Sequence, residues 1–259
     1  MNKRSWFQAG WPPVVAILLL LSAWHYSTII FKLEKWFLPS PVDIVKEAIT
    51  NFDRVWLHTE ATILITLLGM AVGVSIGIIT AVLLHSVPFV HRALYPLLIL
   101  SQNIPMVVLA PLLTIWFGFG VLPKLIVITL VCFFPVVIAM ISGLGSPDRI
   151  MYNYMRMIGA NRRQLFFKLE LPSSLPSFFT GLKISGTYAV MGAIFAEMVG
   201  TDRGIGVYML LAKSAFRIDR LFVAIFVIMA LSLLLFSSIV ILEKLVIRWK
   251  PPTESQRKG

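Results

Sequence analysis

The sequence predicts an all-α integral membrane protein with six transmembrane helices. Its 259 residues are 58% hydrophobic and only 14% charged, whereas a soluble domain averages about 25% charged residues. A soluble fold of this composition would expose large apolar patches and aggregate. Apolar runs of about 20 residues, the length of a helix that crosses a bilayer, recur along the chain. Helices satisfy their own backbone hydrogen bonds in lipid, and the alternating pattern of a membrane β-barrel is absent.

Six segments are long and apolar enough to span a membrane, at residues 11–31, 61–84, 94–117, 122–142, 177–200 and 221–247. We treat residues 1–259 as a single transmembrane domain. The first run is too long for the apolar core of a signal peptide, and no A-x-A site follows it, so we expect an uncleaved first helix. Gly69, Gly73 and Gly77 recur every four residues in the second span, which predicts a face that another helix approaches closely.

The charge distribution predicts the orientation of these helices. The formal net charge is +11. The two termini and the segments 85–93 and 146–173 are more basic, and carry fewer acids, than the loops between the other ends of the spans. Because basic loops face the cytoplasm, we expect both termini there, in a multi-pass protein of the cell membrane surrounded by lipid. No basic-aromatic surface suggests nucleic acid as a partner.

Two further features are structural. Leu38-Pro39-Ser40-Pro41 predicts the start of a helix over about 41–51 outside the membrane, with Ser40 as N-cap and Asp43 in the first turn. The single cysteine, Cys132, lies in an apolar run, so we expect a buried packing residue and no disulfide framework.

No pattern of catalytic, metal-binding or cofactor-binding residues is found. The four histidines are scattered near helix ends, and neither an H-E-x-x-H pattern nor a Cys/His cluster is present. The nearest approach to a phosphate-binding loop is Gly181 to Gly186, but Thr187 follows where a lysine is required. We therefore expect neither enzymatic activity nor ATP binding in this chain.

Polar residues inside the spans are few. Gln102 and Asn103 lie in the third span beside Ile104-Pro105, and Glu197 lies near the outer end of the fifth. They are candidates to line a path for a solute. The alternatives are hydrogen bonds between helices for the two amides and interfacial solvation for Glu197. Lys183, near the cytoplasmic end of the fifth span, is expected to extend to the interface.

The segment 146–173 has strong local signals. Ser146-Pro147-Asp148 predicts the start of a helix that runs to about Ile158. Gly159 is placed to end that helix in a left-handed conformation. Asn161 then predicts the cap of a second short helix, with Gln164 as its capping-box partner. We expect Leu171-Pro172 to close this second helix and Pro176 to open the fifth span.

These two short helices are basic and apolar at once. Their basic residues are Arg156, Arg162, Arg163 and Lys168, and their large apolar residues are Met155, Met157, Ile158, Leu165, Phe166 and Phe167. A solvated basic loop is the alternative, but it has no need of so many apolar side chains. We therefore predict that the segment docks on another protein, through a surface made by Ala160, Leu165 and Phe166.

The same segment resembles a known family. Gly159, nine residues and then Leu169-x-Leu171-Pro172 are similar to the second half of the "EAA" loop of binding-protein-dependent ABC importer permeases. The resemblance extends over nearly the whole chain, through Leu38-Pro39-Ser40-Pro41, Tyr95-Pro96, Ile104-Pro105, Ala110-Pro111-Leu112, Trp116-Phe117-Gly118-x-Gly120, Gly181-Leu182-Lys183-Ile184, and Glu197 with Gly204-Ile205-Gly206. One departure is Asn153-Tyr154-Met155, which stands where the family usually has Glu-Ala-Ala.

The resemblance implies a type I ABC importer-like permease whose cytoplasmic loop is a coupling helix. The residues that it assigns to ATPase coupling are Gly159, Ala160, Arg162, Arg163, Leu165, Phe166, Leu171 and Pro172. It implies three partners: two copies of a separate ATPase subunit, an extracytoplasmic solute-binding protein, and a second permease copy in a homodimer. The most similar subgroup carries sulfonates, taurine, nitrate and thiamine-precursor pyrimidines, so the expected solute is a sulfonate or such a pyrimidine. The alternatives are a secondary transporter or channel working alone, and an intramembrane enzyme.

Overall fold

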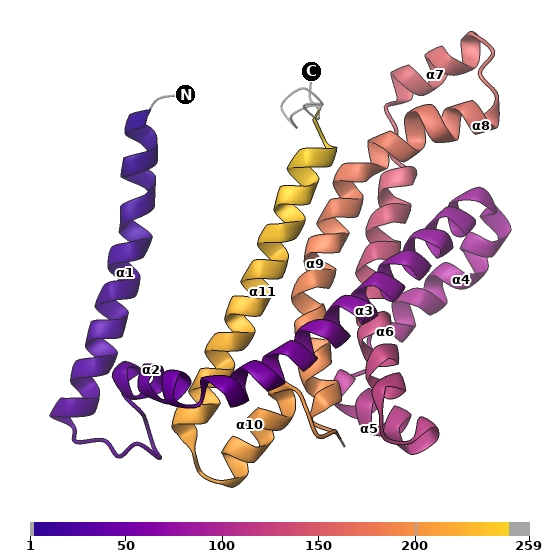
Figure 1. Cartoon of the computed structure of the whole chain (residues 1–259). Helices are drawn as coiled ribbons and strands as arrows, with labels where there is room; N and C mark the ends of the chain where they lie inside the picture. Colours follow the sequence, from indigo (N-terminus) through magenta and orange to yellow (C-terminus); the bar gives the residue numbers. More distant parts are fainter. Residues whose placement is uncertain (1–2, 200, 249–259) are drawn as a thin grey trace.

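The computed structural model describes residues 3–199 and 201–248, and every regular element in that part of the chain is a helix (Figure 1). Position 200, the last of the predicted fifth span, and the tail 249–259 lie outside the described residues. The two ends of the described chain lie at the same end of the molecule as α7 (Arg149–Met157) and α8 (Arg162–Leu165). We call this the α7 end; α2 (Pro41–Thr50) and α10 (Ile205–Ser214) lie at the opposite end, the α2 end.

Five helices are long and apolar enough to cross a membrane, or six if one bent pair forms a single span, among the described residues. The first, α1 (Lys3–Ile30), exposes most of its side chains from Trp11 onward and packs on the rest through Trp24, whose ring centroid lies 5.3 Å from that of Phe222. The predicted helix α2 is confirmed, because the Asp43 backbone N–H donates to Ser40 Oγ at 3.2 Å and Pro41 begins the helix.

Three helices form the centre of the bundle: α3 (Phe52–Ser86), α6 (Val121–Leu144) and α9 (Leu171–Glu197). The predicted glycine face is confirmed, since a Cβ at Gly73 would lie 2.6 Å from the carbonyl oxygen of Thr129. The backbones of α3 and α6 therefore approach too closely for any side chain there. Cys132 is fully buried in this contact region, and Ser185 Oγ donates to its carbonyl oxygen at 2.8 Å, which joins α6 to α9.

The predicted third span, 94–117, is not one helix. It consists of α4 (Pro88–Ser101) and α5 (Met106–Phe117), which meet at an angle of 101°. Pro105 explains the break: it lacks an N–H, and its ring disfavours the helical conformation of Ile104 before it. Pro105 is the N-cap residue of α5, with ψ of 126°.

The predicted end of the second short helix at Leu171-Pro172 is wrong. A helix runs without interruption from Arg162 to Glu197, through α8, a π-helical turn η1 (Phe166–Glu170) and α9. The Leu171 N–H donates to the Phe166 carbonyl, five residues back. This wider turn lies directly before Pro172, which has no N–H to continue the ordinary pattern. Pro176 lies inside the helix, and the last span is α11 (Ile218–Val246).

Candidate functional site

The segment between α6 and α9 is an arm of two short helices at the α7 end (Figure 1). Asp148, and not Ser146, caps α7, because its carboxylate accepts from the Ile150 and Met151 N–H groups at 2.8 and 3.1 Å. Gly159 has φ of +83°, as predicted. The N–H of Gly159 donates to the Arg156 carbonyl and that of Ala160 to the Met155 carbonyl, both at 3.0 Å, which forms a complete Schellman motif.

The start of α8 is also as predicted. The Gln164 N–H donates to Asn161 Oδ1 at 2.8 Å, and the Asn161 N–H donates to Gln164 Oε1 at 2.9 Å, so both halves of the capping box are present. The turn between the two helices is therefore held by the Schellman motif on one side and by the capping box on the other. The angle between α7 and α8 depends on these four hydrogen bonds.

The predicted docking surface of Ala160, Leu165 and Phe166 does not face outward. Leu165 is only 6% exposed, and Ala160 is half-buried. Phe166 packs against the buried cluster of Ala81, Met140 and Leu144. These side chains attach the base of the arm to α3 and α6. Leu171 and Pro172 are half-buried at the same base, while Arg162 and Arg163 are exposed and Arg163 lies 5.9 Å from the Phe167 ring.

Apart from Phe167 in η1, the exposed large apolar side chains of the arm lie on α7 and at its C-cap. Ile150 and Met157 are 82% and 79% exposed, and none of the residues of α7 is buried. We call the residues Ile150, Tyr154, Met157 and Ile158 the α7 stripe; their spacing places them on one face of the helix. Ile150 and Tyr154 were missed as candidates, although the spacing i, i+4, i+7, i+8 is visible in the sequence.

A second contact joins the arm to α3. His85 Nε2 and Glu170 Oε2 are 2.9 Å apart, and their side chains are 19% and 15% exposed. The His85 ring also lies beside Phe166, with ring centroids 6.3 Å apart. This pair connects the last turn of α3 to the π-helical turn η1. Nothing in the local sequence around either residue pointed to the pair, because 85 positions separate them.

Glu197, a candidate residue of the solute path, lies at the end of α9 in a buried network of hydrogen bonds. Its carboxylate is 1% exposed and accepts from Thr62 Oγ1 at 2.8 Å and from the Gly206 N–H at 2.9 Å. Two further backbone N–H groups bond to α3: that of Ile205 to Thr62 Oγ1 at 2.8 Å, and that of Gly204 to His58 Nδ1 at 3.1 Å. Glu197 therefore holds the start of α10 against α3.

The other two candidates lie at the break between α4 and α5. Asn103, in the turn after α4, donates from Nδ2 to the Ile99 carbonyl of that helix at 2.9 Å. Gln102 instead lines a cavity of about 410 Å³ between the break, α6 and α9, together with Tyr188. Tyr188 precedes Glu197 by nine residues, about 13 Å along a helix. The structure therefore places Gln102 and Glu197 in different surroundings and does not bring the three candidates together.

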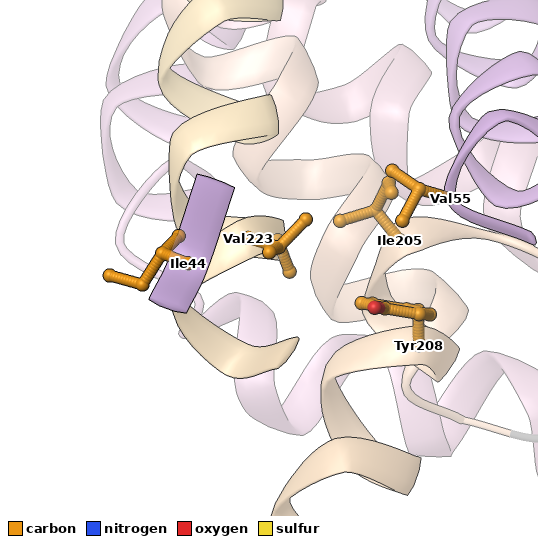
Figure 2. Close-up of a cluster of buried hydrophobic side chains, with 6 residues drawn as sticks. Ile44, Val55, Ile205, Tyr208 and Val223 are labelled. Carbon is orange, nitrogen blue, oxygen red and sulfur yellow. The ribbon is translucent and has the colours of Figure 1, made fainter. Parts of the chain in front are cut away.

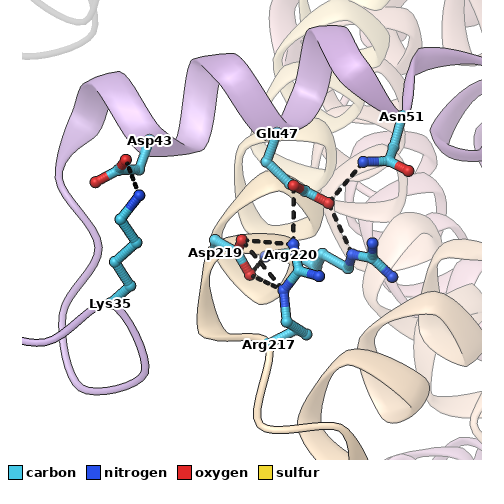
Figure 3. Close-up of polar contacts among 7 residues, drawn as sticks. All are labelled: Lys35, Asp43, Glu47, Asn51, Arg217, Asp219 and Arg220. Atoms are coloured by element: carbon cyan, nitrogen blue, oxygen red, sulfur yellow. Dashed lines mark hydrogen bonds and ion pairs between the residues drawn. The ribbon is translucent and has the colours of Figure 1, made fainter.

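At the α2 end, charged residues link α2 to the start of α11 (Figure 3). The Glu47 carboxylate lies 2.9 Å from Arg217 Nη2 and 2.7 Å from Arg220 Nε, and it is 12% exposed. Asn51 Nδ2 donates to the same carboxylate at 2.8 Å. At the far end of α2, Lys35 pairs with Asp43 at 2.7 Å and holds the pKa of that carboxyl below its usual value.

The same helices share a buried cluster of Ile44, Val55, Ile205, Tyr208, Val223 and Ala224 (Figure 2). Its members come from α2, α3, α10 and α11. The Glu47 contacts and this cluster together fix α2 to the core of the α2 end.

Within residues 3–199 and 201–248, no group of three or more His, Cys, Asp or Glu side chains is placed to hold a metal ion. In α9, Lys183 pairs with Glu243 of α11 at 2.8 Å.

Comparison with known proteins agrees with this architecture. Residues 73–248 match the family model of the "binding-protein-dependent transport system inner membrane component". The chain is 35% identical to a formylaminopyrimidine transport permease protein of Halalkalibacterium halodurans, over 92% of this chain and 95% of that protein. It is 31% identical to a riboflavin transport system permease protein of Chloroflexus aurantiacus, over 96% and 93% of the two chains. It is 26% identical to a taurine transport system permease protein of Escherichia coli, over 90% and 87%.

The family match covers more than half of the chain, and two of these relatives exceed 30% identity over nearly their full length. The resemblance found in the arm is thus confirmed for the molecule as a whole. The chain belongs to the family of binding-protein-dependent transport system inner membrane components, and it is the permease subunit of an ABC importer.

Proposed function

We propose that this permease moves a small pyrimidine related to formylaminopyrimidine into the cytoplasm. The observation that carries the proposal is the 35% identity to the formylaminopyrimidine permease over 92% of the chain. The identities to the riboflavin and taurine permeases are lower, at 31% and 26%. Of the two solute classes that the sequence left open, sulfonate and pyrimidine, the comparison favours the pyrimidine.

The energy for transport comes from a separate ATPase subunit. The sequence has no phosphate-binding loop with the required lysine. The arm, however, presents the α7 stripe, and large apolar side chains exposed on a short helix are typical of a protein interface. The α7 stripe is the docking surface for the ATPase, and the next helix, α8, exposes the basic side chains of Arg162 and Arg163.

The uninterrupted helix Arg162–Glu197 explains how docking affects the membrane helices. It begins in the arm and continues into the contacts with α3 and α6. The His85–Glu170 pair adds a second connection from the arm to α3. Closure of the ATPase dimer shifts the arm, and α3, α6 and α9 move with it as a packed unit, which alternates access between the two sides.

The remaining parts of the transporter follow from the orientation. The basic character of segments 85–93 and 146–173 and of the termini supports a cytoplasmic location for the α7 end. The α2 end then faces outward and receives the solute from a binding protein. Two copies of the permease form the path as a homodimer, and each copy binds one ATPase subunit. The transporter lies in the cell membrane.

Uptake into proteoliposomes tests the solute. The permease is reconstituted with its ATPase, and ATP is enclosed in the vesicles on the ATPase side. Radiolabelled formylaminopyrimidine and the solute-binding protein are supplied outside, on the opposite side of the membrane. We expect ATP-dependent accumulation that excess unlabelled formylaminopyrimidine abolishes and excess taurine leaves unchanged. Accumulation of labelled taurine without accumulation of the pyrimidine would assign the transporter to the sulfonate class.

A further inference from the structure

The cavity at the break between α4 and α5 lies at mid-depth in the bundle. It has a volume of about 410 Å³, within the range of small-molecule sites. Its α6 wall lies halfway along the 24 residues of that helix and consists of Leu130, Val131, Phe134 and Pro135. The opposite wall comes from Tyr188 of α9, and the break itself supplies Gln102. The cavity thus lies where the α4–α5 pair bends.

The three polar side chains at the break, Ser101, Gln102 and Asn103, differ in their hydrogen bonds. Ser101 Oγ donates to the Leu97 carbonyl at 2.9 Å, and Asn103 Nδ2 donates to the Ile99 carbonyl at the same distance. Both side chains therefore donate a hydrogen bond to carbonyl groups of α4. Gln102 is exposed, and among the described residues its side-chain amide forms no hydrogen bond. The Gln102 amide is therefore free to bond a ligand in the cavity, and polar side chains at this depth of a membrane span usually have a function.

The lining of the cavity also defines the class of ligand. No charged residue contributes to it, so a sulfonate or another anion would find no cation there. Besides Gln102 and Ser101, the lining consists of apolar side chains with two aromatic rings, Phe134 and Tyr188. Aromatic rings suit the faces of a flat ring, and an amide matches an edge that carries both a donor and an acceptor. Such a surface fits an uncharged nitrogen heterocycle.

We infer that this cavity is an intramembrane binding site for an uncharged nitrogen heteroaromatic ring, in which Gln102 hydrogen-bonds the edge of the ring and Tyr188 and Phe134 contact its faces. The inference rests on the proposed function, and it adds a second selective step inside the membrane after the solute-binding protein. The permease then discriminates by hydrogen bonding: a bound solute covers the Gln102 amide, and a solute that lacks the matching edge leaves that amide without a partner.

The test compares two neighbouring amides. Gln102→Leu and Asn103→Leu permeases are reconstituted with the ATPase and the solute-binding protein, and uptake of labelled formylaminopyrimidine is measured beside ATP hydrolysis. We expect Gln102→Leu to reduce solute transported per ATP by about tenfold, with hydrolysis still stimulated by the loaded binding protein. Asn103→Leu, which removes a side chain bonded to the preceding helix α4, should transport like the wild type.

A second variant checks the aromatic wall: Tyr188→Leu should reduce uptake, whereas Tyr188→Phe should retain most of it. Equal uptake by Gln102→Leu and Asn103→Leu, with an active wild type, would overturn the site and leave the proposed solute intact. Loss of permease pairing or of ATPase association in Gln102→Leu would also overturn it, because the surface would then be a packing interface. A wild type that transports no pyrimidine would instead contradict the proposed function.

Discussion

Gly159 shows how a single residue determines the geometry of the arm. Its φ of +83° belongs to the left-handed region, and a Cβ built there meets no atom within 4 Å. The need for glycine is therefore conformational and not steric. Left-handed backbone costs an ordinary residue about 1–2 kcal/mol, and asparagine tolerates it better than a β-branched residue does.

Gly159→Val should consequently weaken ATPase association about 5- to 30-fold, the factor that corresponds to 1–2 kcal/mol. The valine disrupts the Schellman motif and tilts α7 against α8. Insertion into the membrane should be unchanged, because no span is altered. Pull-down of the ATPase by the solubilised permease measures the effect, with Gly159→Asn as the matched control. Equal binding by the valine and asparagine variants would show that the turn conformation does not matter.

Glu197 is the residue for which the structure most changes the sequence prediction. Its carboxylate accepts from Thr62 and from Gly206 and is fully buried. Glu197→Ala leaves these donors without a partner, which should destabilise the permease by about 1–3 kcal/mol. Glu197→Gln keeps an acceptor oxygen for one of them and should be milder. Thermal unfolding in detergent compares the two variants. Equal midpoints for both variants and the wild type would mean that the hydrogen bonds of Glu197 contribute nothing to stability.

At the scale of the secondary-structure element, the attachment of α2 to α11 depends on the Glu47 carboxylate, which pairs with two arginines. Glu47 is mostly buried and contacts both Arg217 and Arg220 (Figure 3). Glu47→Gln should destabilise the attachment of α2 to α11 by about 1–3 kcal/mol, since hydrogen bonds to charged groups lie in this range. Proteolysis near α2 would report the loosening. Lys35→Gln is the control: it breaks the exposed pair with Asp43 and should leave the cleavage rate unchanged. Equal cleavage of both variants would contradict the assignment.

The elements predicted well are those with local signals. The cap of α2, the left-handed Gly159 and the capping box of Asn161 and Gln164 all depend on residues within a few positions of one another. The bend between α4 and α5 was missed, because Pro105 could equally have given a mild kink in one helix. The continuity through Pro172 was missed because it depends on a π-helical turn, for which the sequence offers no simple pattern.

The candidate site was predicted only in part for the same reason. Exposure of the α7 stripe and burial of Leu165 are decided by how the arm packs on α3 and α6, not by the arm's own sequence. The His85–Glu170 pair and the Thr62–Glu197 bond connect residues 85 and 135 positions apart. Polar residues inside a span could be listed from the sequence, but which of them face a cavity is a property of the folded bundle.

For the whole molecule, the orientation in the membrane is the first testable property. In a Cys132→Ser background, Gln164→Cys reports the α7 end and Lys46→Cys reports the α2 end. We expect an impermeant thiol reagent to label position 46 in intact cells, and position 164 only after the membrane is opened. The physical reason is the basic character of the arm. Labelling of position 164 in intact cells would reverse the orientation.

The most direct test of the account concerns the α7 stripe, the proposed docking surface that transmits movement of the ATPase to the membrane helices. Ile150→Ser combined with Met157→Ser removes its two most exposed side chains, and α7 contains no buried residue, so folding and insertion should be intact. Arg156→Gln, on another face of the same helix, is the control. The measurement is co-purification of the ATPase together with uptake in cells. We predict that the double variant loses both while the control retains both; normal ATPase binding and normal uptake in the double variant would contradict the account.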